Sequence, residues 1–278
     1  MSPTPPALSK LQARQRDRVF WRLAEDIPQP LTWKLMVISA VVPLLLWWLL
    51  ASSGWISDKF LPSPPDVLAA MGDLWERGLL VQDTRASIVR VTLGFVLAAV
   101  VATPIGILMA AFASIRALLE PAIGILRYMP APAFVPLLII YLGIDEAPKI
   151  ALIFIGTVFF NTLMIMDAGK FVPKALIEAT YTLGGSRWQI LRQVIWPYII
   201  PNVLDIFRVN MAASWNLVVV AELIAASEGL GKRIELARKF LNTDEIFACL
   251  IVLGLIGFSI DMSFRVLIRK TCAWSLDS

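Results

Sequence analysis

Long apolar runs alternate with short polar segments along this chain of 278 residues. A helix needs about 20 predominantly apolar residues to cross the hydrocarbon core of a bilayer. Six runs approach or exceed that length, at 33–51, 88–112, 118–142, 150–166, 200–226 and 246–267. The pattern predicts an all-α integral membrane protein with six transmembrane helices.

The third run is interrupted by Pro121, Pro130, Pro132 and Pro136. Proline lacks an N–H and kinks or breaks a helix interior. Broken backbone at membrane depth is tolerated only where protein or a water-filled cavity covers it. We therefore expect the third span to be kinked or broken, and covered there by protein or by a water-filled cavity. Between the first two spans, residues 66–77 are expected to form a short surface helix.

Composition and charge support this class and suggest an orientation. Hydrophobic residues make up 58% of the chain, and the mean hydropathy is +0.73. With the N-terminus placed inside, fourteen Lys and Arg fall on the inner side and eight on the outer side. Cytoplasmic loops carry the excess of Lys and Arg, so both termini are predicted to be cytoplasmic, in a bacterial inner membrane. Residues 1–31 form an interfacial helix or a disordered tail.

Several kinds of chemistry are disfavoured. The chain has no histidine and only two cysteines, Cys249 and Cys272, so a metal site, a disulfide and a His-dependent catalytic centre are not expected. The sequence 229–232, Gly-Leu-Gly-Lys, is followed by Arg233 and fails the phosphate-loop pattern. We predict a transport protein rather than an enzyme, with no catalytic residue and no cofactor of its own.

The polar stretch between the fourth and fifth spans predicts two short helices joined by glycines. Gly184 and Gly185 should end the first helix, because glycine adopts left-handed backbone without a side-chain penalty. Ser186 begins the second helix, and Gln189 completes a capping box. Pro197 is expected to end that second helix.

The spacing in this stretch resembles the "EAA" loop of ABC importer permeases, which contacts a separate ATPase. The resemblance is carried by Glu178-Ala179-Thr180, then Gly184, then Val194-Ile195-Trp196-Pro197. Further stretches resemble the nitrate/sulfonate/taurine/bicarbonate group of these permeases. They are Leu61-Pro62-Ser63-Pro64, Arg127-Tyr128-Met129-Pro130, Gly143-Ile144-Asp145-Glu146, Ala221-Glu222-Leu223 and Gly229-Leu230-Gly231.

The resemblance implies a type I ABC importer permease fold over 32–278, with a cytoplasmic coupling loop at 169–199 and a separate N-terminal segment at 1–31. It implies import of a small anionic solute such as a sulfonate, nitrate or bicarbonate, delivered by an extracytoplasmic solute-binding protein. The implied partners are a second permease copy, the bilayer, and ABC ATPase subunits that hold ATP and Mg; nucleic acid is not expected. The residues implied in ATPase coupling are Glu178, Ala179, Gly184, Gly185, Ser186, Arg187 and Trp188.

Polar residues inside the spans are candidates for the translocation path, because ionisable groups there usually face a cavity or the bundle interior. We expect Arg127, Asn161, Arg208 and Asn216 to line it. Asp205 and Arg208 share a helix face and are expected to pair. Arg90 and Glu222 lie near span ends and are interpreted as snorkelling to water.

A secondary transporter or channel that is not coupled to ATP is the alternative. A secondary transporter would show inverted internal repeats, and no clear repeat is present. Neither alternative accounts for the helix–glycine–helix spacing.

Overall fold

The computed structural model describes residue 20 and residues 27–275, and every regular element in these ranges is helical. Contacts divide the chain into two units, residues 1–64 and 65–278, which are described separately. The elements are α2 (Gln29–Ser52), α3 (Pro64–Glu76), α4 (Leu79–Ala111), α5 (Ala113–Leu126), η2 (Ala131–Phe134), α6 (Val135–Leu142), α7 (Ala147–Gly169), α8 (Lys174–Thr182), α9 (Arg187–Ile190), η3 (Leu191–Ile195), α10 (Trp196–Ala225), α11 (Leu230–Phe240), α12 (Thr243–Thr271) and η4 (Ala273–Ser275).

The predicted spans are confirmed in number and in kind. Five described stretches are long and apolar enough to cross a membrane: α2, α4, α7, the stretch from α9 into α10, and α12. The sixth is a bent pair, Ala113–Leu126 and Ala131–Leu142, whose helices meet at 82°. Pro130 lies at the break, whereas Pro121 sits inside α5 without ending it. The N-terminal interfacial helix was predicted for residues that lie largely outside the described ranges.

In the first unit, α2 carries most of the apolar residues. Its Trp47 indole Nε1 donates a hydrogen bond of 3.0 Å to the Pro62 carbonyl. This bond holds the segment that follows the helix close to the last turns of α2.

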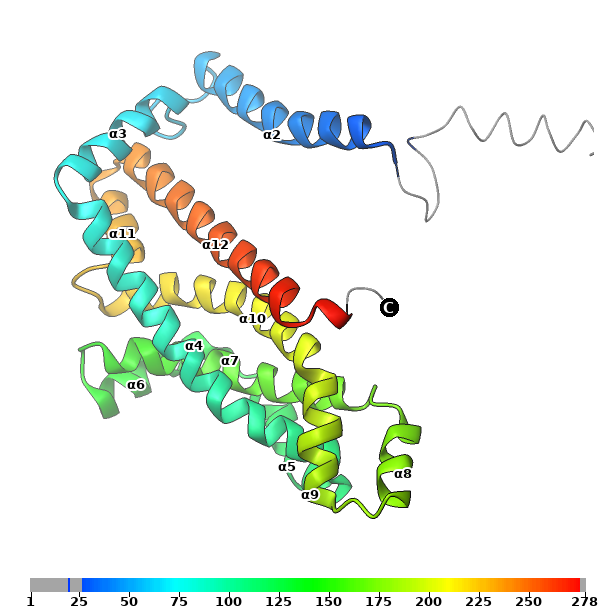
Figure 1. Cartoon of the computed structure of the whole chain (residues 1–278). Coiled ribbons are helices and arrows are strands. Elements are labelled where there is room, and N and C mark those ends of the chain that lie inside the picture. The colour runs from blue at the N-terminus through cyan, green and yellow to red at the C-terminus, as the bar shows by residue number, and fades with distance from the viewer. Residues whose placement is uncertain (1–19, 21–26, 276–278) are drawn as a thin grey trace, which may run out of the picture. The chain divides into compact units, whose positions relative to one another are not determined.

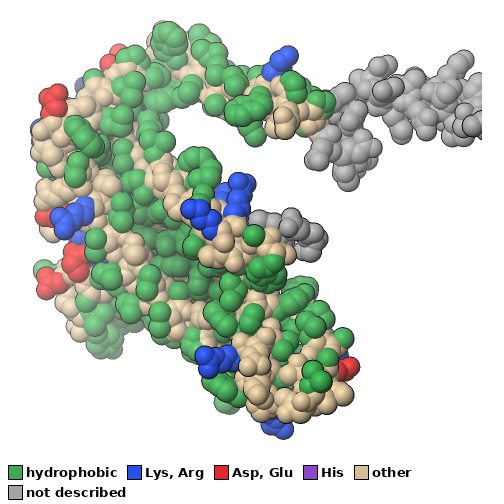
Figure 2. All heavy atoms as spheres, in the orientation of Figure 1, with side chains coloured by type: hydrophobic (Ala, Val, Ile, Leu, Met, Phe, Trp, Pro, Cys, Tyr) green, Lys and Arg blue, Asp and Glu red, His purple; other side chains and the backbone are tan. Residues whose placement is uncertain are grey.

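The second unit is built on α4, α7 and α10 (Figure 1). Gly94, Ala98 and Ala102 are buried on α4. They allow α7 to approach closely, because a Cβ at Gly94 would lie 2.7 Å from Ile153 Cβ. Small residues at helix interfaces permit this close packing in membranes. Figure 2 shows hydrophobic side chains over much of the visible face, as expected where lipid surrounds the spans.

The prediction that Pro197 ends the second helix of the polar stretch is wrong. Pro197 lies in the first turn of α10, and the π-helical turn Leu191–Ile195 joins it to α9 without a gap. Within this continuous helix Pro197 has no N–H to donate to the preceding turn. A π turn is where the regular ladder is locally altered, so the chain accommodates the proline there and the helix continues into the span.

Candidate functional site

The helix–glycine–helix loop has the local structure that its sequence predicts. Gly184 has φ +80°, in the left-handed region. Its N–H donates to the Tyr181 carbonyl at 2.9 Å, and the N–H of Gly185 donates to the Thr180 carbonyl at 2.9 Å. This pair of bonds is the Schellman arrangement. A Cβ on Gly185 would lie 2.6 Å from Thr180 Cγ2, so the second glycine is required for space.

The second helix begins at the predicted capping box. The Gln189 side chain accepts from the Ser186 N–H at 2.7 Å, and the Ser186 hydroxyl accepts from the Gln189 N–H at 3.3 Å. Together these bonds satisfy two backbone donors that a helix start leaves free. They fix the direction in which α9 leaves the glycine turn.

Replacing Ser186 with alanine is expected to weaken α9 without unfolding the protein. Loss of a serine cap costs about 1 kcal/mol, which corresponds to roughly fivefold more frequent opening of the first turn. Hydrogen exchange of the amides at 187–190 in the assembled transporter measures this. Unchanged exchange would show that contacts elsewhere, rather than the cap, hold the helix.

One side of this loop is buried and the other is exposed. Val172 and Ile190 belong to an apolar cluster with Ile165 and Ile199 of the neighbouring spans. In contrast, the side chains of Leu183 and Trp188 are 88% and 66% exposed. Glu178, Ala179, Gly184, Ser186, Arg187 and Trp188, all predicted coupling residues, are exposed as well, and Gly185 is half-buried. The loop is a firmly held projection with an exposed outer surface.

The four predicted path residues are not brought into one site. Asn161 is buried and accepts a hydrogen bond of 2.6 Å from Asn210. Arg127 stacks on the Tyr128 ring at 4.9 Å beside the broken span. Asn216 is exposed and donates to Ala212 of its own helix. No hydrogen bond or ion pair joins any two of the four in the part of the chain that the structure describes.

Arg208, the fourth of these residues, forms the predicted pair with Asp205. Its Nη2 lies 3.0 Å from Asp205 Oδ1, and its Nε lies 3.7 Å from Asp261 Oδ1 on α12. The arginine therefore connects α10 to α12. A path-lining role for it remains a prediction.

The interpretation that Arg90 and Glu222 snorkel to water is wrong. Glu222 is 0% exposed and Arg90 is 3% exposed. Their Nη1 and Oε1 atoms lie 2.6 Å apart, and the Ser87 hydroxyl donates to both Glu222 oxygens at 2.8 and 2.9 Å. The pair joins α4 to α10 inside the protein, where an unpaired charge would be costly.

Residues 229–231, at the start of α11, are held by the carboxylates of Glu222 and Asp83. The N–H of Gly231 donates to Glu222 Oε2 at 2.9 Å, and the N–H of Gly229 donates to Asp83 Oδ1 at 2.8 Å. A Cβ on Gly231 would lie 2.7 Å from the Val219 carbonyl oxygen, so no larger residue fits. These N–H groups are already bound within the chain, in agreement with the rejection of a phosphate loop.

Glu146, in the connection between α6 and α7, completes the cluster. Its carboxylate accepts two hydrogen bonds from Arg90, through Nε and, at 2.8 Å, through Nη2. Lys149 Nζ donates to the same carboxylate at 2.9 Å. Hydrogen bonds from Arg90, and to a smaller extent the one from Lys149, lower the pKa of Glu146 from 4.5 to about 2. Partial burial of the carboxyl group acts in the opposite direction but is the smaller effect. The carboxylate is therefore charged at every physiological pH, and its favourable contribution is lost only as the pH falls from about 4.5 toward 2.

This ionic cluster comprises Asp83, Ser87, Arg90, Glu146, Lys149, Glu222 and Arg233. Sequence reasoning weighed only Arg90 and Glu222 among these residues as charges within a span. Glu146 entered through the family resemblance and Arg233 through the phosphate-loop test, and none was predicted to be part of a cluster. A signal was present in the spacing, since Asp83, Ser87 and Arg90 recur every three or four residues and so share one face of a helix. Glu146 and Lys149 are likewise three apart.

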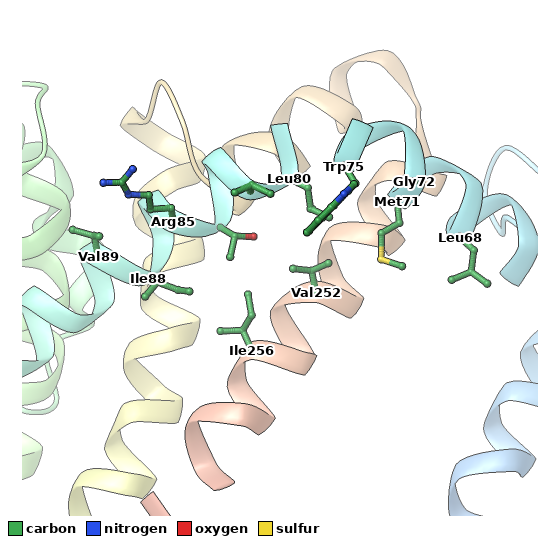
Figure 3. A pocket seen from close by; sticks show the side chains of 12 residues that line it. Leu68, Met71, Gly72, Trp75, Leu80, Arg85, Ile88, Val89, Val252 and Ile256 are labelled. Carbon is green, nitrogen blue, oxygen red and sulfur yellow. The ribbon is translucent and has the colours of Figure 1, made fainter. Parts of the chain in front are cut away.

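The cluster and the exposed loop lie toward opposite ends of α4 (Figure 1). Near the cluster, α3, α4 and α12 line an apolar groove of about 810 Å³ (Figure 3). Its sides are formed by residues such as Leu68, Trp75 and Val252, with Arg85 as its one charged residue. Such a lining suits hydrocarbon rather than a charged solute, so the groove is not a candidate path.

Comparisons with known proteins agree with this architecture. The family described as "Binding-protein-dependent transport system inner membrane component" matches residues 102–271. The taurine transport system permease protein TauC of Escherichia coli is 35% identical over 271 residues, covering 95% of this chain and 96% of TauC. SsuC of Bacillus subtilis, whose name associates it with aliphatic sulfonates, is 32% identical and covers 87% of this chain and 88% of its own.

A solved structure shows the same fold. The MetNI methionine ABC transporter in an inward-facing conformation matches with a TM-score of 0.63 at 19% identity, covering 69% of this chain and 95% of that chain. The family match extends over more than half of the sequence. The chain therefore belongs to the binding-protein-dependent inner membrane components, the multi-pass permease subunits of ABC importers.

Proposed function

We propose that this permease imports a small organic sulfonate, using ATP hydrolysed on a separate chain that docks on the α8–α9 loop. The exposed and firmly held outer surface of this loop is the observation that carries the coupling proposal. A projection that transmits a rigid-body motion must be fixed at its base and free on its outer side. Both conditions are met by Val172 and Ile190 at the base and by Leu183 and Trp188 outside.

The ATPase would bind ATP and Mg, since this chain has no phosphate loop of its own. Within loop 169–199, Glu178, Ala179, Arg187 and Trp188 offer the docking partner one acidic, one small apolar, one basic and one aromatic side chain. The termini would then be cytoplasmic, in agreement with the excess of Lys and Arg on that side. A homodimer of permeases with one external solute-binding protein completes the proposed assembly.

The substrate class rests on the relatives named for taurine and aliphatic sulfonates. Another relative, the riboflavin permease RibX of Chloroflexus aurantiacus, is 30% identical and covers 77% of this chain and 80% of RibX. The family thus spans chemically different solutes. The near full-length similarity to TauC favours the sulfonate class for this chain.

Reconstituted transporter should import sulfonates in an ATP-dependent manner. The permease, its companion ATPase and its binding protein are placed in proteoliposomes, and uptake of labelled taurine and ethanesulfonate is compared with that of riboflavin. We expect sulfonate uptake that stops when ATP is withheld. Uptake without ATP would contradict the coupling, and uptake of riboflavin without competition by ethanesulfonate would contradict the substrate class.

A further inference from the structure

We propose that Arg90 and Lys149 form an anion-binding site, that the Glu146 carboxylate occupies it here as an internal counter-ion, and that the sulfonate group of the solute displaces this carboxylate during passage. This inference rests on the proposed function in taking the solute to be a sulfonate. It assigns an anion-binding role to Arg90, Lys149 and Glu146 of the ionic cluster.

The donors around Glu146 have the geometry of an oxyanion site. The guanidinium of Arg90 presents Nε and Nη2 side by side to the two carboxylate oxygens. The ammonium of Lys149 approaches Oε1 from a second direction at 2.9 Å. A planar fork combined with a point charge is the donor set that proteins use for carboxylate, phosphate and similar anions. A sulfonate presents three oxygens of the same kind.

Because the side chains of Arg90 and Lys149 are buried, their positive charges need an anion beside them. Arg90 keeps Glu222 as a second partner at 2.6 Å, but Glu146 is the only acid that pairs with Lys149 within the described residues. The Lys149 side chain is 3% exposed. A buried ammonium without a counter-charge is strongly unfavourable. If Glu146 leaves, another anion must therefore take its place, or the lysine must lose its proton.

Glu146 is also the member of the cluster that can leave. Its side chain is 52% exposed, whereas those of Arg90 and Lys149 are buried. It lies in the short connection after the broken span, where Gly143 has φ +81°. The Glu146 carbonyl accepts a hydrogen bond of 3.1 Å from the Ile150 N–H, which fixes its backbone to the start of α7. The exposed carboxylate can still leave by rotation of its own side chain, without disturbing the packed spans.

Glu146 lines two cavities. One, of about 500 Å³, is lined by Lys149, Glu146 and Asp145, with Ile139 and Ile224. The other, of about 730 Å³, is lined by Arg90, Glu146, Arg85 and Glu228. Each is of the size that holds a small solute, and Glu146 is common to both. The carboxylates of Asp145 and Glu228 offset the positive charge elsewhere in the two cavities. A bound anion is therefore stabilised most at the position that Glu146 vacates.

Replacing Glu146 with glutamine should open the site to external anions. The assembled transporter is purified in detergent, and its thermal midpoint is followed as ethanesulfonate replaces chloride at fixed ionic strength. We expect E146Q to be stabilised at concentrations at least tenfold lower than those that affect the unchanged protein. The double variant E146Q/K149Q, which has no orphaned ammonium, should lose this response. E146D, with its shorter carboxylate, should respond between the two and serves if E146Q cannot be purified.

Asp145→Asn is the matched control, because it removes a neighbouring exposed acid that holds neither cation. An equal ethanesulfonate response in D145N would overturn the site, as would the absence of any response in both E146Q and E146D. This readout does not depend on uptake. If the unchanged protein fails to import sulfonates, the proposed function fails, while the comparison of E146Q with E146Q/K149Q still decides whether the site binds anions.

Discussion

Replacing Gly184 with valine is expected to reduce ATP-driven uptake at least tenfold while the protein still folds and assembles. The backbone at Gly184 has φ +80°, and a β-branched side chain is strained there by about 1–2 kcal/mol or more. A Cβ at this position would meet no atom within 4 Å, so the effect arises from the backbone alone and not from a clash. The turn between α8 and α9 should therefore relax to another conformation. Uptake and ATP hydrolysis measured together in proteoliposomes test this result.

Gly184→Asn is the control, because asparagine visits the left-handed region more readily than other side chains. It should retain most of the uptake. ATP hydrolysis that persists without uptake in G184V would identify loss of coupling rather than loss of the ATPase. Normal uptake in G184V, or an equal loss in G184N, would show that the conformation of this turn does not carry the coupling.

The features that the sequence predicts well are those whose causes lie close together along the chain. The Schellman turn and the capping box are complete within the ten residues 180–189, so residue type alone indicates them. The break in the third span follows from Pro130 for the same reason. Apolar run length likewise predicts the spans, because the bilayer imposes a minimum length.

Features that depend on tertiary partners are predicted less well. The second span was expected to begin at residue 88, yet α4 begins at Leu79. Asp83 interrupts the hydrophobicity of the first turns, but its charge is paired with Arg233, just as Arg90 within the predicted span is paired with Glu222. Burial of a charge is favourable only with such partners. A pattern read along one helix cannot show a partner that is 132 residues away.

The candidate functional residues also divide into those whose partners are local in the sequence and those whose partners are distant. The residues predicted to couple to the ATPase form one local segment, and this segment has the helix–glycine–helix structure that its sequence predicts. Glu146 and Ser87 contact partners on other helices, Arg90 and Glu222, that are distant in the sequence. Helical spacing indicates that each has a preferred face, but not which faces meet.

Replacing Glu222 with alanine is expected to give the largest loss of stability among single substitutions in the ionic cluster. The change leaves the buried Arg90 Nη1, the Ser87 hydroxyl and the Gly231 N–H without their common acceptor. Removing one partner of a buried ion pair costs about 3–5 kcal/mol when the other charge is left uncompensated. Arg90 keeps Glu146 as a counter-charge, so we expect a loss toward the lower end of that range. The thermal midpoint of the purified transporter in detergent should fall sharply. Glu222→Gln should cost less, since its amide oxygen can still accept from Ser87 and Gly231.

Asp73→Asn provides the comparison with an exposed pair. Asp73 and Arg77 lie 3.1 Å apart, but their side chains are 61% and 54% exposed. Solvent screens such a pair, so its loss should cost at most about 1 kcal/mol. If E222A is no less stable than D73N, the buried cluster does not hold α4, α10 and the start of α11 together.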